Sequence, residues 1–466
     1  MNNDSCRPPF GILFTLSVSF VLLFGACTSA VEPTRTPTVA PTATRTEIFS
    51  PMPPTEPVSN PETPATCPPL DAQMRATMRQ LEGQVTRLRG LPASGVVERD
   101  LLTPEQLRER VENDFLADYT EEEARLDNRL LALLGLIEPE LDLHRLYVDL
   151  LAEQVAGFYD SQEEEMLVVC GTGFGGLEIF TYVHEYVHAL QDQTFDLEAG
   201  LNFSEEACEL DGERCFALRA LIEGDASLLQ EQWLRTYADR EMLASLLSSL
   251  SSFDSPVLES APEYIQAELT FPYLAGLSFT RSLYLEGDWA AVDSAFQNPP
   301  LSSEQILHPE RYPRDEPVAL SPPPDLDSLA DGWGVERQDV LGEWATQQVL
   351  LSYLSEDAVQ KSVGGWGGDL IFLLERSAND PAALVLITQW DTVRDTHEFA
   401  AEFMNYAEAR FGQPAHRDLV EATWVFDGGA SHFMRQSNQT RWIIAPDGET
   451  LSMLQAEFAL PLASAP

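Results

Sequence analysis

The sequence predicts an α+β protein that is mainly α-helical, with a smaller α+β region at its C-terminal end. Three observations support this prediction. Apolar residues recur at helical spacing between residues 70 and 300, as they do in Met74, Met78 and Leu81. Two strand-like stretches interrupt these helices near residue 160. Further strand-like stretches, separated by a helical one, follow residue 364.

Residues 1–30 have the pattern of an export signal, with a short apolar run between residues 10 and 24. The run ends in Leu23-Phe24-Gly25-Ala26-Cys27, which resembles the lipobox of bacterial lipoproteins. This resemblance implies lipidation of Cys27 and attachment to the membrane at the bacterial cell surface. Ordinary cleavage near Ala30 and an uncleaved anchor are the alternatives.

The next segment, residues 31–69, consists mainly of Pro, Thr, Ala and Ser. It has too few large apolar side chains to form a core, so we expect a disordered tether. A helical domain is expected over residues 70–325 and an α+β region over residues 326–466, separated by the proline-rich stretch at 321–324.

The formal net charge of −47 excludes some classes of partner. Surfaces that bind nucleic acid or anionic lipid are basic, so neither partner is expected. We expect the acidic side chains to form a solvated surface instead. The 44% hydrophobic content is sufficient for a sizeable core.

Helical and strand patterns follow one another before the most informative stretch of the chain. A cap followed by proline, Thr103-Pro104, marks one helix start, and further helices fit Glu121–Leu134 and Leu141–Gln154. Residues 155–160 and 165–170 then read as two strands joined by an acidic turn. An exposed edge of such a pair can hold an extended peptide by main-chain hydrogen bonds.

The stretch Thr181–Leu190 carries the motif His184-Glu185-Tyr186-Val187-His188. On a helix, residues four apart lie on one face, so both imidazoles would point into the same space. Glu185 would then reach a water bound between them, which is the arrangement of a zinc hydrolase. The uncharged neighbours indicate a buried helix. The alternative is an amphipathic helix whose two histidines have ordinary hydrogen-bond partners.

A catalytic zinc ion usually has three protein ligands and one open position. The pattern HExxHxxGxxH is absent, because Gln191 and Thr194 stand where Gly and His are required. Glu223 is the better candidate, since a carboxylate within an apolar helical run is costly to bury unless it is paired or metal-bound. Arg219, one turn earlier, is the alternative partner for Glu223.

Two aspartates near these residues are candidates for supporting roles. Asp192 lies one turn after His188 and is a weaker ligand candidate. Asp225 is a candidate for orienting an imidazole, a role often filled around zinc histidines.

This combination of HExxH with a downstream glutamate resembles the gluzincins, the thermolysin-type clan of zinc metallopeptidases. More narrowly, HEYVHALQDQ with ALIEGDA is similar to uncharacterised bacterial surface lipoproteins assigned to that clan. The resemblance implies a zincin-like core, one catalytic Zn²⁺, Glu185 as general base and a peptide or protein substrate. Thermolysin-type enzymes carry an aspartate four residues after the glutamate ligand, whereas this chain has Ser227.

Hydrolysis through a tetrahedral intermediate needs a donor directed at the developing oxyanion. Tyr273, His308 and Tyr312 are the candidates, and simple packing or loop capping is the alternative for each. His397, His416 and His432, further along the chain, have no metal-ligand spacing among themselves.

Four cysteines remain outside the predicted signal, and in an exported protein they suggest two disulfides. Cys208 and Cys215 are close in sequence and form the first expected pair, and Cys67 with Cys170 follows by elimination. No CxxC pair is present, which argues against a zinc site made of cysteines.

The C-terminal region begins with the Trp-Gly cluster at 364–369, which is expected to form a tight turn anchored by Trp366. Strands are expected at 370–374, 382–390, 423–426, 431–435 and 440–445, with a helix at 396–411.

The sequence therefore predicts a surface-tethered zinc metallopeptidase. Two alternatives remain open. One is a catalytically inactive surface binding or scaffold protein, which a fourth protein ligand to the zinc would favour. The other is a zinc hydrolase that acts on a non-peptide substrate. The sequence makes no prediction about the oligomeric state.

Overall fold

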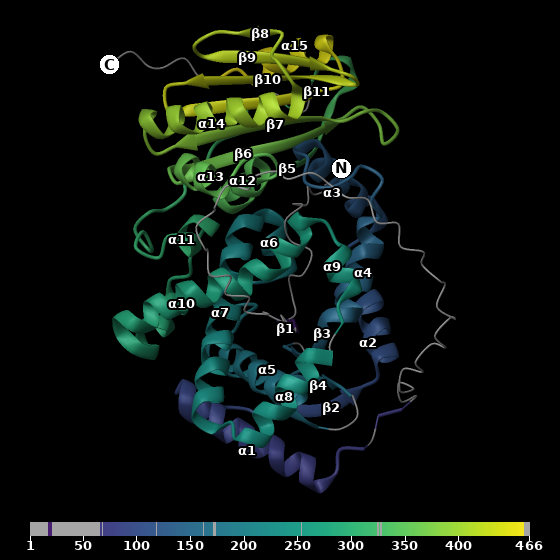
Figure 1. Ribbon diagram of the computed structural model, residues 1–466, viewed down its shortest axis with the longest axis vertical. Helices are drawn as coiled ribbons and strands as arrows, with labels where there is room; N and C mark the ends of the chain where they lie inside the picture. The colour runs from purple at the N-terminus through teal and green to yellow at the C-terminus, as the bar shows by residue number, and fades with distance from the viewer. Residues whose placement is uncertain are drawn as a thin grey trace, which may run out of the picture.

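The computed structural model describes residues 17–20 and 66–460, apart from positions 68, 118, 162, 171–173, 253, 324–325 and 327–328. Within these residues the fold is α+β and mainly helical, as predicted. The molecule is elongated, with a helical part around a small sheet at one end and a larger sheet at the other (Figure 1). Cys27 and residues 31–65 of the predicted tether lie outside the described residues.

The first helices pack on both faces of the small sheet, and two of their starts are fixed by capping boxes. Thr103 and Thr120 each begin a helix with a capping box, in which side chain and backbone exchange two hydrogen bonds. The elements in chain order are α1 (Ala72–Arg89), α2 (Pro104–Arg110), the π-helical turn η1 (Val111–Phe115), α3 (Glu121–Leu134) and α4 (Leu143–Gln154).

The small sheet has four strands in the order β1-β3-β4-β2. The predicted antiparallel pair is present as β3 (Val155–Asp160) and β4 (Glu165–Val169). No strand was predicted for β2 (Glu98–Leu102), which runs parallel to β4, because its first three residues are charged. The remaining strand, β1 (Ser17–Phe20), pairs antiparallel with β3.

Strand β1 changes one expectation about the sheet. It occupies the edge of β3 that was expected to be exposed, with Ser17 opposite Tyr159 and Phe20 opposite Val155. Its residues fall inside the predicted export signal. An extended segment therefore lies along β3 and also contacts the next helix, α5 (Gly176–Phe195).

The rest of the helical part packs around α5. Every residue of α5 from Thr181 to Gln191 is buried, because α1, α7, α8 and β3 all contact this helix. A short non-helical segment, Ala238 and Asp239, separates two of these helices. The elements are α6 (Glu205–Leu210), α7 (Gly212–Tyr237), α8 (Arg240–Ser252), α9 (Pro256–Ser260), α10 (Glu263–Gln297) and α11 (Ser303–Leu307).

Helices α7 and α10 approach each other through two glycines. A Cβ atom on Gly276 would lie 2.0 Å from the Ala220 carbonyl oxygen, and one on Gly224 would lie 2.2 Å from the Gly276 carbonyl oxygen. Neither position has room for a larger side chain. This contact fixes the part of α7 that carries Glu223.

The C-terminal region contains a seven-stranded antiparallel sheet in the order β5-β6-β7-β11-β10-β9-β8. Trp366 belongs to strand β6, not to the expected tight turn, and its indole donates to Asp369. The elements are η3 (Ala330–Gly332), β5 (Gly334–Asp339), α12 (Gly342–Leu351), α13 (Glu356–Val363), β6 (Trp366–Glu375), β7 (Ala383–Trp390), α14 (Val393–Phe411), β8 (His416–Arg417), β9 (Glu421–Phe426), β10 (Gly429–Gln436), β11 (Gln439–Ala445) and α15 (Gly448–Glu457).

Both faces of this sheet are covered, which explains why β6 is buried along its whole length. Ile371 and Leu373 point to the side of α14, into a core that continues through the helical part of the protein. Leu370 and Phe372 point to the opposite side, where they join the core beneath α15. The two regions of the chain therefore share one continuous core.

Both expected disulfides are confirmed, with Cα–Cα distances of 5.8 Å for Cys67–Cys170 and 5.5 Å for Cys208–Cys215. Such bonds indicate an oxidising, extracellular-type environment.

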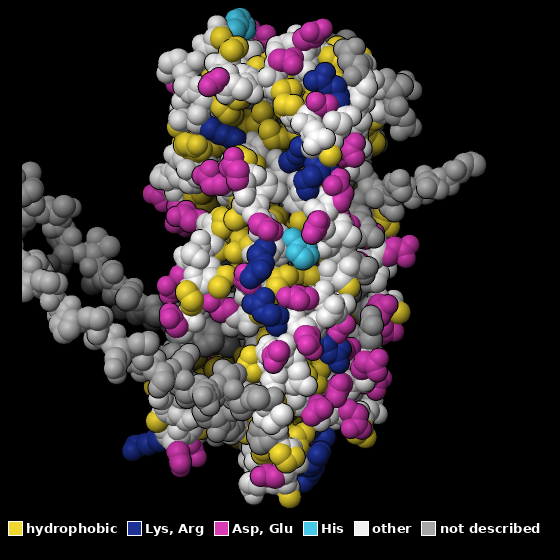
Figure 2. Space-filling model, turned by 90° about the vertical axis from the view of Figure 1, so that its right-hand side faces the viewer, with side chains coloured by type: hydrophobic (Ala, Val, Ile, Leu, Met, Phe, Trp, Pro, Cys, Tyr) yellow, Lys and Arg dark blue, Asp and Glu magenta, His cyan; other side chains and the backbone are white. Residues whose placement is uncertain are grey.

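No helix among the described residues is both long and apolar enough to cross a membrane. Acidic side chains are scattered over the face shown in Figure 2, as expected for a solvated acidic surface.

Candidate metal centre

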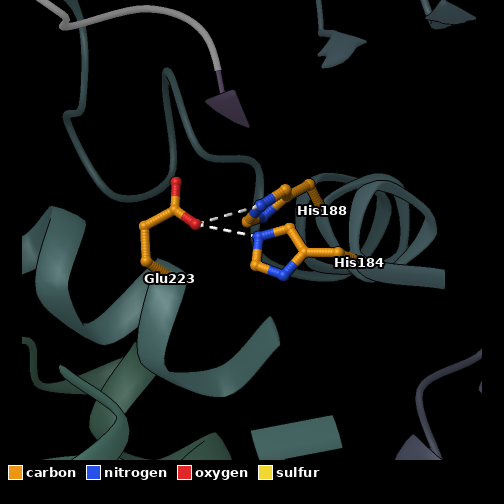
Figure 3. A group of neighbouring side chains, drawn as sticks. All are labelled: His184, His188 and Glu223. Carbon is orange, nitrogen blue, oxygen red and sulfur yellow. Dashed lines mark hydrogen bonds and ion pairs between the residues drawn. The ribbon is translucent and has the colours of Figure 1, made fainter. Parts of the chain in front are cut away.

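Three buried side chains from two helices meet at one point, as Figure 3 shows. His184 and His188 come from α5 and Glu223 comes from α7. Glu223 Oε2 lies 2.9 Å from His184 Nε2 and 3.5 Å from His188 Nε2. All three side chains are almost completely inaccessible to solvent. The structure thus brings together the three residues that the sequence indicated as metal ligands.

The orientation of His188 is fixed by Gln191, which stands where the pattern HExxHxxGxxH requires glycine. The Gln191 amide nitrogen donates to the Ile222 carbonyl and to Asp225, at 3.0 and 2.8 Å. Both of these partners only accept, so the Gln191 oxygen must face His188 Nδ1, which lies 2.8 Å away. His188 Nδ1 is therefore protonated and donates to Gln191, which leaves Nε2 as the nitrogen that faces Glu223.

His184 has a corresponding glutamine on α7. Gln230 donates from its amide nitrogen to the Phe180 carbonyl at 2.9 Å and also forms a side-chain hydrogen bond with His184. Each imidazole is thus held by an amide side chain that is itself anchored to a backbone carbonyl. Such partners set the tautomer and orientation of metal-binding histidines.

A further ion pair holds Gln191 in place. Asp225 accepts from Gln191 with one oxygen and from Arg89 with the other, the second distance being 2.7 Å. Arg89 also pairs with Asp293 at 2.7 Å and lies over the ring of Trp289. Asp225 therefore reaches His188 through Gln191, which agrees with the supporting role expected for Asp225 around the imidazoles.

The charges within the group are strongly coupled. Burial would raise the pKa of Glu223, but the two imidazoles lower it to about 2. Burial would likewise lower the pKa of His188, yet Glu223 and Glu185 raise it to about 9. Burial lowers the pKa of His184. In this arrangement Glu223 is ionised and its charge is offset by a proton on His188, a position that a metal cation would take over.

Glu185 and Asp192 lie on the β3 side of α5. Glu185 is fully buried and accepts a hydrogen bond from the Tyr159 backbone at 3.0 Å. Asp192 accepts from the Tyr159 hydroxyl at 3.1 Å and does not belong to the group formed by the three ligand candidates. The weaker prediction that Asp192 is a ligand is therefore wrong, and Asp192 is a partner of β3.

Of the three candidates for an oxyanion donor, the structure places Tyr273 beside the metal group, which is the group formed by His184, His188 and Glu223. The rings of Tyr273 and His184 lie 6.1 Å apart, and Tyr273 comes from the first half of α10. His308 instead lies 3.0 Å from Glu343 of α12, and the Tyr312 hydroxyl donates to the Asn298 carbonyl. Both residues have these partners at the junction with the C-terminal region or at the end of α10, and no described contact joins either of them to the three ligand candidates.

The residues present fit a metal ion. His188 Nε2 is buried, has no hydrogen-bond partner among the described residues and faces Glu223 Oε2 at 3.5 Å. Two imidazole nitrogens and one carboxylate oxygen are a common ligand set for catalytic zinc. Among the described residues the group contains these three side chains and no fourth His, Cys, Asp or Glu. Three ligands leave a position for water or substrate.

Comparison with known proteins adds one finding about the C-terminal region. Residues 328–455 match the model of a domain of unknown function, DUF8575. This match covers most of the seven-stranded sheet and its helices, and it does not include the metal group. The chain matches no curated protein and no solved structure.

Proposed function

We propose that this protein is a zinc-dependent metallopeptidase of gluzincin type that cleaves peptide or protein substrates. The convergence of His184, His188 and Glu223 in one buried group carries the proposal. Bound zinc would lower the pKa of a coordinated water to about 7. The remaining chemistry depends on side chains of this chain.

Glu185 is the proposed general base. It follows His184 on α5, is fully buried and interacts electrostatically with His188. In the proposed reaction Glu185 takes the proton from the attacking water and passes it to the leaving amine. Tyr273, beside His184, is the proposed donor to the developing oxyanion. His184 and His188 are kept in position by Gln230 and Gln191.

The arrangement of β3 favours a peptide over other substrates. Its backbone N–H at Tyr159 donates to Glu185, so the strand runs directly beside the proposed base. An extended segment, β1, already pairs antiparallel with β3 through Val155–Tyr159. A substrate peptide held in the same manner would present its backbone to the metal group. Tethering through a lipid on Cys27 would then place this activity at the bacterial cell surface.

The decisive test combines metal analysis with one substitution. Purified protein should contain about one zinc per chain. Glu185→Gln should keep that zinc and lose hydrolysis of a peptide library by at least about 10²-fold, the lower range for a general base. Glu198→Gln, in an exposed position after α5, is the matched control and should retain full activity.

Three outcomes separate the proposal from its alternatives. Full peptidase activity in Glu185→Gln would contradict the role of this residue. Zinc in the protein together with no cleavage of any peptide, with or without chelator, would favour a binding or scaffold function. Hydrolysis of a non-peptide ester or amide that Glu185→Gln abolishes would assign the site to another substrate class.

A further inference from the structure

The outer strands of the seven-stranded sheet bring two histidines to one face. His416 belongs to β8 and His432 to β10, and Thr423 of the intervening strand β9 is the pairing partner of both. Residues that pair across neighbouring strands point to the same side of a sheet. Glu421 stands two residues before Thr423 and therefore points to that side as well. Strand pairing creates this arrangement, so sequence spacing did not indicate it.

Each oxygen of the Glu421 carboxylate faces one of the two imidazoles. Oε1 lies 3.7 Å from His416 Nε2, and Oε2 lies 3.5 Å from His432 Nε2. Both distances exceed the usual hydrogen-bond range of about 2.7–3.2 Å. They are close to about 3.4 Å, which separates two ligands that each lie about 2.1 Å from a tetrahedral zinc ion. The carboxylate is therefore spaced from each ring as one metal ligand is from another.

Asp418, in the turn between β8 and β9, adds a second carboxylate. Its Oδ1 accepts from the backbone N–H groups of Val420 and Glu421, at 2.8 and 2.9 Å, which fixes the side chain within the turn. Oδ2 takes no part in these bonds. One ligand atom from each of His416, Asp418 and Glu421 lies within 4.8 Å of the other two. In the described part of the chain, neither carboxylate forms an ion pair with a lysine or arginine.

His432 is the buried member of these four side chains, with 2% of its surface exposed. Its Nδ1 is buried and has no hydrogen-bond partner among the described residues, while Nε2 faces Glu421. Arg441 lies on the same face, but its Nη1 donates to the carbonyls of Gln455 and Phe458 at the end of α15. A buried imidazole without a close hydrogen bond is costly, and a metal ion bonded to Nε2 would supply the missing interaction.

We infer that the outer-strand group, which comprises His416, Asp418, Glu421 and His432, binds one zinc ion. Imidazole nitrogens combined with carboxylate oxygens suit zinc, whereas calcium and magnesium prefer oxygen ligands alone. Four protein ligands are typical of a structural zinc site, since they leave no position for water. The whole group lies within residues 328–455, the part of the chain that matches DUF8575. The inference therefore concerns that domain and does not depend on the proposed peptidase function.

The position of the ligands gives this ion a structural role. Strand β8 is only two residues long and forms the edge of the sheet, so few main-chain hydrogen bonds hold it. Zinc bound by the outer-strand group links β8 to β9 and β10, and it stabilises the folded chain as any ligand of the native state does. These strands lie at the opposite end of the molecule from α5, which carries two of the residues of the metal group (Figure 1).

Equilibrium dialysis of the full chain against ZnCl₂ tests the site. The His416 side chain is 59% exposed, so we expect this ion to be lost in zinc-free buffer while the buried metal group keeps its own. Titration should then add about one further zinc per chain. His416→Ala removes an exposed ligand and should weaken this binding at least about 10-fold, because even the loss of an indirect partner of a metal ligand costs 10–100-fold. Glu421→Gln should weaken it by a similar factor.

His397→Ala is the matched control. His397 is an exposed histidine on α14 of the same region, and it belongs to none of the possible metal-binding groups in the described part of the chain. This variant should bind the further zinc as the unaltered chain does. Equal zinc affinity in His416→Ala and His397→Ala, or no saturable uptake of a further zinc by the unaltered chain, overturns the inference. His416→Ala should keep the zinc of the metal group, and His184→Ala should keep that of the outer-strand group, so the two proposals fail independently.

Discussion

The substitution Gln191→Leu tests whether the orientation of His188 is built into the metal centre. Leucine has a similar size but removes three hydrogen bonds, to His188 Nδ1, the Ile222 carbonyl and Asp225. Their partners are buried, and each one left without a partner costs about 1–3 kcal/mol. Asp225 keeps its bond to Arg89, so two partners are lost outright. We therefore expect the zinc-free chain to lose about 2–6 kcal/mol of unfolding free energy.

Zinc affinity should fall as well, for a separate reason. Without Gln191 nothing in the described contacts holds the proton on His188 Nδ1, so the imidazole can rotate or present the wrong nitrogen. Loss of such a partner typically costs 10–100-fold in metal affinity, or about 1.4–2.8 kcal/mol. Competition with a chelator of known affinity measures this loss in the folded protein, and denaturant unfolding measures the stability.

A second glutamine serves as the control. Gln266 donates to the Ala261 carbonyl near the start of α10 and does not contact the metal group. Gln266→Leu should leave zinc affinity unchanged within about twofold, since an isolated partly buried hydrogen bond contributes only about 1 kcal/mol to folding. If Gln191→Leu binds zinc as tightly as Gln266→Leu does, the assigned role of Gln191 is refuted.

Two further predictions concern the helix contact and the buried acids. Gly276→Ala should lower the unfolding free energy by at least about 1–3 kcal/mol, the usual cost of overpacking, because its methyl group would overlap the Ala220 carbonyl. Thermal unfolding checks this, and unchanged stability would contradict the close contact of α7 with α10. Burial raises the pKa of Glu213 to about 8 and that of Asp369 to about 6. The native state therefore holds these protons more tightly than the unfolded chain, so the contribution of these two groups to stability is fully present below about pH 4 and is lost as pH rises towards 8, by a few kcal/mol. Denaturant unfolding at pH 5 and pH 8 measures the slope, which Glu213→Gln should reduce, and an equal slope in that variant would contradict the assignment.

The sequence predicted local features of the site well because they depend on short-range geometry. The spacing of His184 and His188 determines that both lie on one face of a helix, whatever surrounds it. Glu223 could be selected because an acidic residue within an apolar helix needs a partner. The two disulfides followed from counting cysteines in an exported chain.

Other features depend on contacts between distant segments, and the sequence carries little trace of them. Strand β2 begins with three charged residues and is stabilised by pairing with β4, so its local pattern does not indicate a strand. His308 and Tyr312 lie near the end of the predicted helical domain, and their partners are Glu343 and the Asn298 carbonyl. Neither contact could be read from spacing, because each residue is held by its own loop geometry.

Gln191 occupies the place beside His188 that a carboxylate often takes beside a zinc-binding histidine. A carboxylate bonded directly to a zinc histidine raises the basicity of the ligand, whereas the neutral Gln191 amide fixes its orientation and adds less charge. Here the carboxylate, Asp225, stands one hydrogen bond further away and is neutralised by Arg89. The buried group therefore avoids a second uncompensated negative charge beside Glu223. Because this neutralisation depends on α1, removing Arg89 should disturb the metal centre although Arg89 contacts none of its ligands.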